Sequence, residues 1–172
     1  GLGPDGSIFG GEIYRADRHQ FTRLGHLAPL SLPGGDRAAL EPWRMGLSLL
    51  YSLLKEKALQ PQHQPPSLHA IEPARQQLLG QMLVKKVNCP PTSSCGRLFD
   101  AVSALMGLCL VSQYEGQAAM LLEQQAALAT DEAAGGRYPV VNTAIDEQRV
   151  IDSTTMVAGL LTDLAQGIPV PV

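Results

Sequence analysis

Apolar residues recur every three to four positions in five stretches of the chain, the spacing that places them on one face of a helix. Asp36 and Asp152 stand where a side-chain cap begins a helix, and glycines follow two of the stretches. This pattern predicts helices over residues 43–54, 74–86, 94–106, 117–129 and 153–166.

Near the N-terminus the pattern changes to short β-type runs. Residues 7–14 predict a strand that Gly10 and Gly11 interrupt, and residues 21–30 predict a second strand, with 15–20 as the turn of a hairpin. A further short strand is predicted at Val140–Val141. The fold class is therefore α+β and mostly α, with a β-hairpin part over 1–32 and a helical bundle over 36–172, in one domain.

Two segments interrupt the helical part. Residues 60–73 hold four prolines and two histidines among glutamines. This composition predicts a proline-rich linker that contributes nothing to the core. Residues 130–136 are polar and glycine-containing, and we expect them to form a flexible loop.

Composition narrows the classes of function. The 172 residues are 45% hydrophobic and 17% charged, with a net charge of −3, so no basic face for nucleic acid is expected. No apolar run reaches the length of a membrane span, and no signal-peptide pattern is present. The three cysteines show no paired spacing, which favours reduced thiols in a cytoplasmic protein, and the four histidines lack the spacing of a metal site.

The most informative stretch is the helix predicted to start at Ser93 or Ser94. Either serine can cap it, and the same helix start can hold an anion. Arg97 and Asp100 fall away from the apolar face. From the residues alone, Asp100 is best explained as a solvated partner of Arg97.

Two glycine-containing steps accompany this helix. Gly107 is predicted to end it, and Tyr114–Glu115–Gly116 is predicted to turn into the next helix. Gly10–Gly11 offers backbone N–H groups that an oxyanion can approach closely. From the residues alone, however, a β-bulge is the simpler explanation of Gly10–Gly11.

These motifs resemble the HypF carbamoyltransferase family of [NiFe]-hydrogenase maturation. The resemblance rests on matching strings that follow one another in family order and span most of the chain. They are residues 9–12 (FGGE), 32–36 (LPGGD), 41–45 (EPWRM), 93–101 (SSCGRLFDA) and 114–118 (YEGQA). It implies an interior segment of an actin-like (ASKHA) nucleotide-binding domain.

The resemblance also implies roles for individual residues. Gly10, Gly11 and Glu12 would face the phosphates and the carbamoylated substrate, although related enzymes that carbamoylate tRNA carry histidine where Glu12 stands. The nucleotide would be bound by Asp100 through its ribose, with the neighbouring Gly96 and Arg97, and by the turn at Gly116 and Gln117. Relatives carry a second glycine in place of Gln117.

The implied chemistry begins with carbamoyl phosphate and ATP, which give carbamoyl adenylate and pyrophosphate. The carbamoyl group then passes to the C-terminal cysteine of a HypE-like acceptor protein, as a precursor of the cyanide ligands of the hydrogenase. A divalent metal is expected in the intact enzyme, with ligands outside this chain, and the chain alone is expected to be inactive. The alternatives are a non-catalytic helical interaction module and a related O- or N-carbamoyltransferase.

Overall fold

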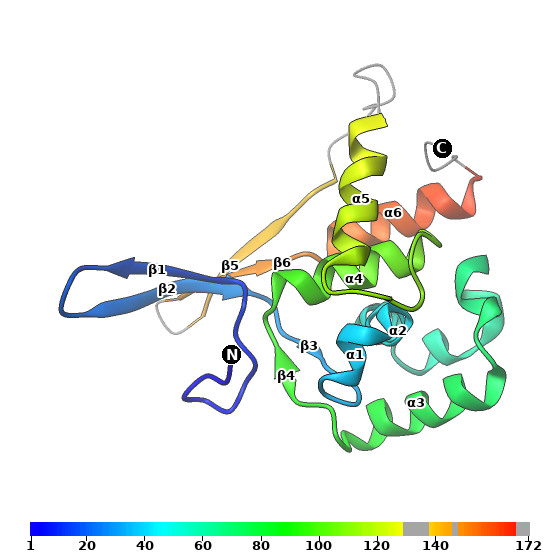
Figure 1. The fold of residues 1–172 in the computed structure, drawn as a ribbon, viewed down its shortest axis with the longest axis horizontal. Helices are drawn as coiled ribbons and strands as arrows, with labels where there is room; N and C mark the ends of the chain where they lie inside the picture. Colours follow the sequence, from blue (N-terminus) through cyan, green and yellow to red (C-terminus); the bar gives the residue numbers. More distant parts are fainter. Residues whose placement is uncertain (129–137, 146–147, 168–172) are drawn as a thin grey trace.

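The computed structural model describes residues 1–128, 138–145 and 148–167. A helical body lies on one side, and a β-hairpin projects from it on the other (Figure 1). The strands are β1 (Glu12–Ala16), β2 (Phe21–Leu27), β3 (Leu30–Ser31), β4 (Pro91–Thr92), β5 (Val141–Ile145) and β6 (Gln148–Asp152). The helices are α1 (Arg37–Leu40), α2 (Pro42–Leu54), α3 (Pro73–Lys85), α4 (Cys95–Leu105), α5 (Gln117–Leu128) and α6 (Thr154–Ala165).

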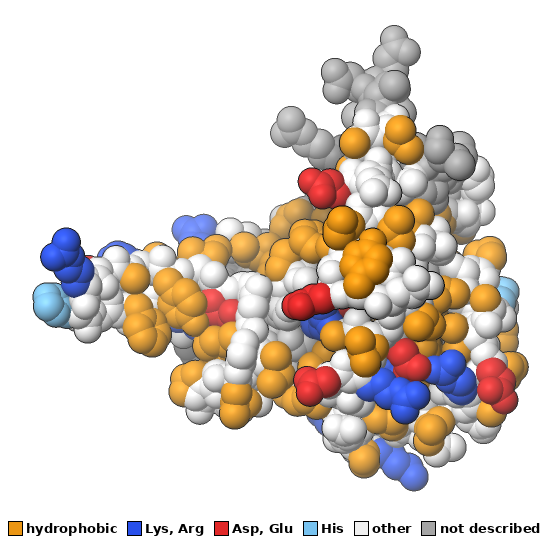
Figure 2. All heavy atoms as spheres, viewed as in Figure 1, with side chains coloured by type: hydrophobic (Ala, Val, Ile, Leu, Met, Phe, Trp, Pro, Cys, Tyr) orange, Lys and Arg blue, Asp and Glu red, His pale blue; other side chains and the backbone are white. Residues whose placement is uncertain are grey.

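Four strands form a mixed sheet in the order β1-β2-β6-β5. β1 and β2 form the predicted antiparallel hairpin, with a register shift between Ile13 and Tyr14. β6 joins β2 in parallel and β5 in antiparallel pairing. Figure 2 shows hydrophobic side chains exposed along the hairpin, where Tyr14 and Phe21 meet edge to face with their ring centroids 5.4 Å apart. The hairpin prediction is confirmed, whereas β6 was not predicted.

The core lies where α2 packs against α4. The apolar face of α2 is buried almost completely, and Pro42 is tolerated because it is the first residue of the helix, where no intrahelical N–H bond is lost. The fully buried side chains of the core come from both helices and include Trp43, Met45, Leu49, Leu50 and Leu105.

A charged cluster ties the start of α2 to the helices on either side. The buried carboxylate of Glu41 pairs with Arg44, with Arg37 at 3.3 Å and with Arg75 at 2.5 Å. Burial alone would raise the pKa of Glu41, but the hydrogen bond from Arg44 and the three positive charges outweigh it and hold that pKa below its usual range. Basic side chains gather beside acidic ones between α1 and α3 (Figure 2).

Residues 60–73 are not a free linker, and that prediction is wrong. Leu68 is 1% exposed and Ile71 is 6% exposed, so both belong to the core. The segment folds into 3-10 turns, and its polar side chains bond to the backbone of the body. Gln64 donates to the Ala58 carbonyl at 2.9 Å, and Ser67 donates to the Leu105 carbonyl at 2.9 Å.

The predictions for the helix ends are confirmed in part. Asp152 accepts a hydrogen bond from the Thr154 N–H at 2.8 Å, which confirms its role at the start of α6. Asp36 precedes α1 but makes no side-chain cap, so that prediction is wrong. Gly107 follows α4 with a φ of +79°, as expected of a helix-ending glycine. The loop predicted over 130–136 lies outside the described residues.

The fold class is confirmed as α+β with helices predominating. The helices α2, α3, α4, α5 and α6 form the larger part, and the sheet lies beside them (Figure 1). Within the described ranges, no helix is both long enough and apolar enough to cross a membrane.

Candidate functional site

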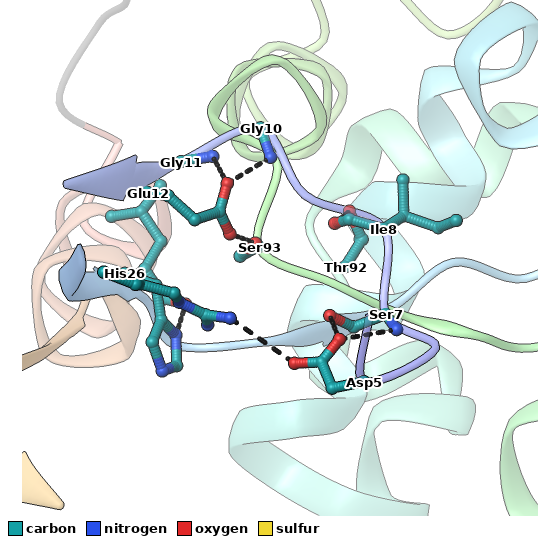
Figure 3. A network of polar contacts seen from close by, with 11 residues as sticks. Asp5, Ser7, Ile8, Gly10, Gly11, Glu12, His26, Thr92 and Ser93 are labelled. Carbon is teal, nitrogen blue, oxygen red and sulfur yellow. Dashed lines mark hydrogen bonds and ion pairs between the residues drawn. The ribbon is translucent and has the colours of Figure 1, made fainter. Parts of the chain in front are cut away.

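A cradle of hydrogen-bond donors lies where the chain enters β1. The backbone N–H groups of Gly10 and Gly11 donate to Oε2 of Glu12, with N···O distances of 2.6 and 3.0 Å. The hydroxyl of Ser93 donates to the other oxygen, Oε1. Figure 3 shows the carboxylate of Glu12 held between the glycine step and Ser93. We call these three donors the anion cradle, because adjacent backbone N–H groups with a hydroxyl form a site for an oxyanion.

Gly11 is required by close approach of the chain, and Gly10 is closely approached as well, while neither has a left-handed φ. A Cβ at Gly11 would overlap the carbonyl oxygen of Ser93. A Cβ at Gly10 would lie 3.0 Å from Oγ of Ser94 and 3.1 Å from its Cα. The expected bulge in the first strand falls later, between Ile13 and Tyr14, so it does not account for the glycine pair.

The start of α4 is pinned against this glycine step. Ser93 N–H donates to the Ile8 carbonyl at 3.0 Å, and Cys95 N–H donates to the Gly10 carbonyl at 3.3 Å. The hydroxyl of Thr92 donates to the same Ile8 carbonyl at 2.9 Å (Figure 3). These bonds hold the two segments together although more than eighty residues separate them along the chain.

The prediction that a serine side chain caps the start of α4 is wrong. Ser94 occupies the N-cap position, but its side chain makes no capping hydrogen bond. Ser93 is 4% exposed and directs its hydroxyl to Glu12. Sequence reasoning treated Ser93 as a cap and so did not include it among the site residues. Its place directly before a predicted helix, where an anion can bind, was the available signal.

His26 lies on the strand beside Glu12. The two residues are opposite each other in the β1–β2 register, so their side chains share one face of the hairpin. Nδ1 of His26 is 2.8 Å from the Leu27 carbonyl oxygen (Figure 3). His26 was not identified from the sequence.

Asp100 is buried, which corrects the expectation that it faces away from the apolar side into solvent. It is 4% exposed, and its Oδ2 lies 2.9 Å from Nη2 of Arg97. The two form an ion pair, yet Oδ2 lacks a partner with hydrogen-bond geometry. Burial raises the pKa of Asp100 to about 6, and the charge of Arg97 offsets only part of that rise. The predicted pairing with Arg97 is confirmed.

The remaining predicted nucleotide residues lie along α4 and at the start of α5. A Cβ at Gly96 would meet only Oγ of Ser94, at 3.7 Å, so this position has room for a side chain. Gly116 is exposed with a φ of +79°. Oε1 of Gln117 accepts a hydrogen bond from the Gln113 N–H at 2.6 Å, so this side chain closes its own turn.

Thiol and metal chemistry find little support in the part of the chain that the structure describes. Burial raises the pKa of Cys95 and that of Cys89, which disfavours a thiolate nucleophile at either position. Among the described residues, no three His, Cys, Asp or Glu side chains lie together as ligands for a metal ion.

A family model described as "Carbamoyltransferase, Kae1-like Domain, second subdomain" matches residues 1–172. The chain belongs to the HypF carbamoyltransferase family. It is 41% identical over 143 residues to carbamoyltransferase HypF2 of Cupriavidus necator, a match that covers 82% of this chain and 17% of that protein. It is 43% identical over 148 residues to HypF of Rhodobacter capsulatus, covering 85% of this chain and 18% of that protein.

Solved HypF structures show the same fold. A full-length HypF in a phosphate- and nucleotide-bound form superposes with a TM-score of 0.82 at 28% identity, covering 97% of this chain and 24% of that one. HypF of T. kodakarensis superposes with a TM-score of 0.71 at 24% identity, covering 94% and 21%, and shows the fold alone. The chain thus spans between 17% and 24% of the length of these HypF proteins.

Proposed function

We propose that this chain forms part of the catalytic domain of a carbamoyltransferase that acts in [NiFe]-hydrogenase maturation. In this proposal, carbamoyl phosphate and ATP give carbamoyl adenylate and pyrophosphate. The carbamoyl group then passes to the C-terminal cysteine of a HypE-like acceptor protein. Membership of the HypF family supports the reaction class, and the finer steps are our inference from the resemblance.

The anion cradle is the observation that carries the proposal. Three donors converge there on one carboxylate, and two of them are backbone N–H groups of glycines, which carry no Cβ of their own beside the N–H. Donors fixed in this way stabilise negative charge on an oxygen without having to reorganise. A carbamoyl carbonyl that is attacked at its carbon develops such charge, so the cradle suits this reaction.

The nucleoside half of the site is proposed from the resemblance. Asp100 would accept the ribose hydroxyls, and Gly96, Arg97, Gly116 and Gln117 would line the same side. In this structure Asp100 is buried and paired with Arg97, so binding of a ribose would require its carboxylate to become accessible. The divalent metal that the resemblance implies has no ligand cluster among the described residues, and no step of this proposal depends on it.

Titration of the chain with ATP by isothermal calorimetry tests the nucleotide half. We expect a saturable heat that Asp100→Asn weakens about tenfold or more, since a charged acceptor of two hydroxyls is lost. Arg37→Ala is the matched control, because Arg37 is exposed and distant in sequence from the predicted site. Absence of nucleotide heat in the unmodified chain and in Asp100→Asn alike would favour a non-catalytic interaction module.

A further inference from the structure

The contacts of Glu12 describe the shape of a ligand. One oxygen of a planar carboxylate accepts two N–H bonds from Gly10 and Gly11, and the other meets the hydroxyl of Ser93. The cradle therefore receives a flat group with two heteroatoms on one carbon. A carbamoyl group has this outline, with a carbonyl oxygen in place of one carboxylate oxygen and an NH₂ group in place of the other.

The donors and acceptors of the cradle also match a carbamoyl group. Its carbonyl oxygen would accept from Gly10 and Gly11, as Oε2 of Glu12 does. Its NH₂ group would donate to Oγ of Ser93, because a hydroxyl has acceptor lone pairs as well as its proton. Ser93 is 4% exposed and held by its own backbone bond to Ile8, so its hydroxyl stands at a fixed place.

We propose that Glu12 occupies the position of the substrate carbamoyl group in the ligand-free chain, and that Ser93 is the residue that recognises the carbamoyl NH₂. This inference rests on the proposed function and deepens it, because it names the part of the substrate that the cradle binds. The carbamoyl group enters only when the side chain of Glu12 leaves. Binding is therefore weakened by the hydrogen bonds that Glu12 gives up.

In this proposal His26 is the partner of the Glu12 carboxylate once it has left the cradle. His26 faces Glu12 across the β1–β2 pair. Because Nδ1 of His26 lies 2.8 Å from the Leu27 carbonyl oxygen and takes the donor role there, Nε2 donates to the carboxylate only when the ring is doubly protonated. The proposal requires rotation about the side-chain bonds of Glu12 alone, with the backbone of Gly10 and Gly11 left in place.

The test follows the backbone amide signals of Gly10 and Gly11 by NMR, with acetamide and inorganic phosphate as probes. In Glu12→Ala the cradle is open, and we expect acetamide to shift both signals saturably at concentrations about tenfold lower than in the unmodified chain. Ser93→Ala in the Glu12→Ala background should remove most of that gain. Phosphate, which is tetrahedral, should show no such gain.

Three results would overturn the proposal. The first is an acetamide response that is the same with and without Glu12. The second is an acetamide response of Glu12→Ala that Ser93→Ala does not change, and the third is a preference of the open cradle for phosphate.

Glu12→Gln provides a second test if Glu12→Ala disturbs the local fold. Its amide is a carbamoyl mimic, so the Gly10 and Gly11 signals should remain hydrogen-bonded and its NH₂ should show contacts to Ser93. Loss of both features would also refute the proposal. Because these readouts involve no nucleotide, their failure is distinguishable from failure of the ATP titration.

Discussion

Ser93 donates its hydroxyl to the carboxylate of Glu12, although 81 positions separate the two residues in the chain. This bond joins the start of α4 to the start of β1, and the glycine step lies between them (Figure 3). The site is therefore assembled by tertiary contact, since neither segment alone contains the three donors. Changes at this junction should affect folding and ligand binding together.

Gly11→Ala should destabilise the chain strongly, because the new Cβ would overlap the Ser93 carbonyl oxygen, which is backbone and cannot turn aside. We expect a loss on the order of 2 to 4 kcal/mol in the free energy of unfolding. Gly96→Ala is the matched control, since its Cβ has room and alanine favours a helix, and it should be neutral or stabilising by about 0.5 to 1 kcal/mol. Urea unfolding measures both; equal effects would refute the close-approach argument.

Asp100 should make stability depend on pH. Its pKa in the folded state is about 6, above its unfolded value, so the folded state binds the proton more tightly. The associated stability is complete at pH values below the unfolded pKa and is lost as the pH rises through about 6. The loss should be on the order of 1 to 2 kcal/mol once solvent screening is allowed for.

Thermal melts between pH 4 and pH 7.5, compared with those of Asp100→Asn, measure this effect. The asparagine variant lacks the titrating group, so the difference between the two proteins should change as the pH rises from the unfolded pKa to about 6 and should level off above it. A difference that is constant with pH would show that Asp100 is not buried as described.

Glu41→Gln should destabilise the body by about 2 to 4 kcal/mol, because it leaves Arg44 and Arg75 beside a site without a compensating charge. Arg37→Ala serves as a control and should cost less than about 1 kcal/mol, since the Arg37 side chain is 65% exposed.

The lowered pKa of Glu41 also means that the contribution of Glu41 to the free energy of unfolding is present above the unfolded pKa and is lost as the pH falls below it. Chemical unfolding at neutral and acidic pH tests both statements. Similar losses in the two variants would contradict this view of the cluster.

Leu68→Ala tests whether residues 60–73 belong to the core. Leu68 is 1% exposed, and its truncation should cost about 2 to 4 kcal/mol in unfolding free energy. His63→Ala, at an exposed position of the same segment, should change stability by less than about 0.5 kcal/mol. If the leucine variant were as stable as the histidine variant, the segment would be a linker after all.

The helices and the first hairpin could be predicted because their signals are local. Periodic apolar positions around Trp43 and Leu98 record which face of each helix is buried. Strand β6 was missed because its pairing with β2 joins residues more than a hundred positions apart, and its sequence, QRVID, has weak alternation. The proline-rich segment was misjudged because composition does not show that Leu68 and Ile71 find a surface to cover.

The candidate site was predicted in part for the same reason. Gly10, Gly11 and Glu12 were identified by motif, and their contacts now show why two glycines stand together. Ser93 and His26 were not identified, because their roles arise from the approach of α4 and β2 to Glu12. Asp100 was expected in solvent but is buried, because helical projection gives no account of which neighbours enclose a polar residue. The nucleotide roles of Asp100, Gly116 and Gln117 stay predictions.

One measurement tests the central claim most directly, namely that the anion cradle serves carbamoyl transfer. This chain replaces the corresponding segment of full-length HypF from Rhodobacter capsulatus, and pyrophosphate release that requires both ATP and carbamoyl phosphate is measured. The chimera should be active, and Ser93→Ala should lower its rate about tenfold or more while a variant at the exposed His63 leaves the rate unchanged. An active chimera whose rate is untouched by Ser93→Ala would contradict the claim.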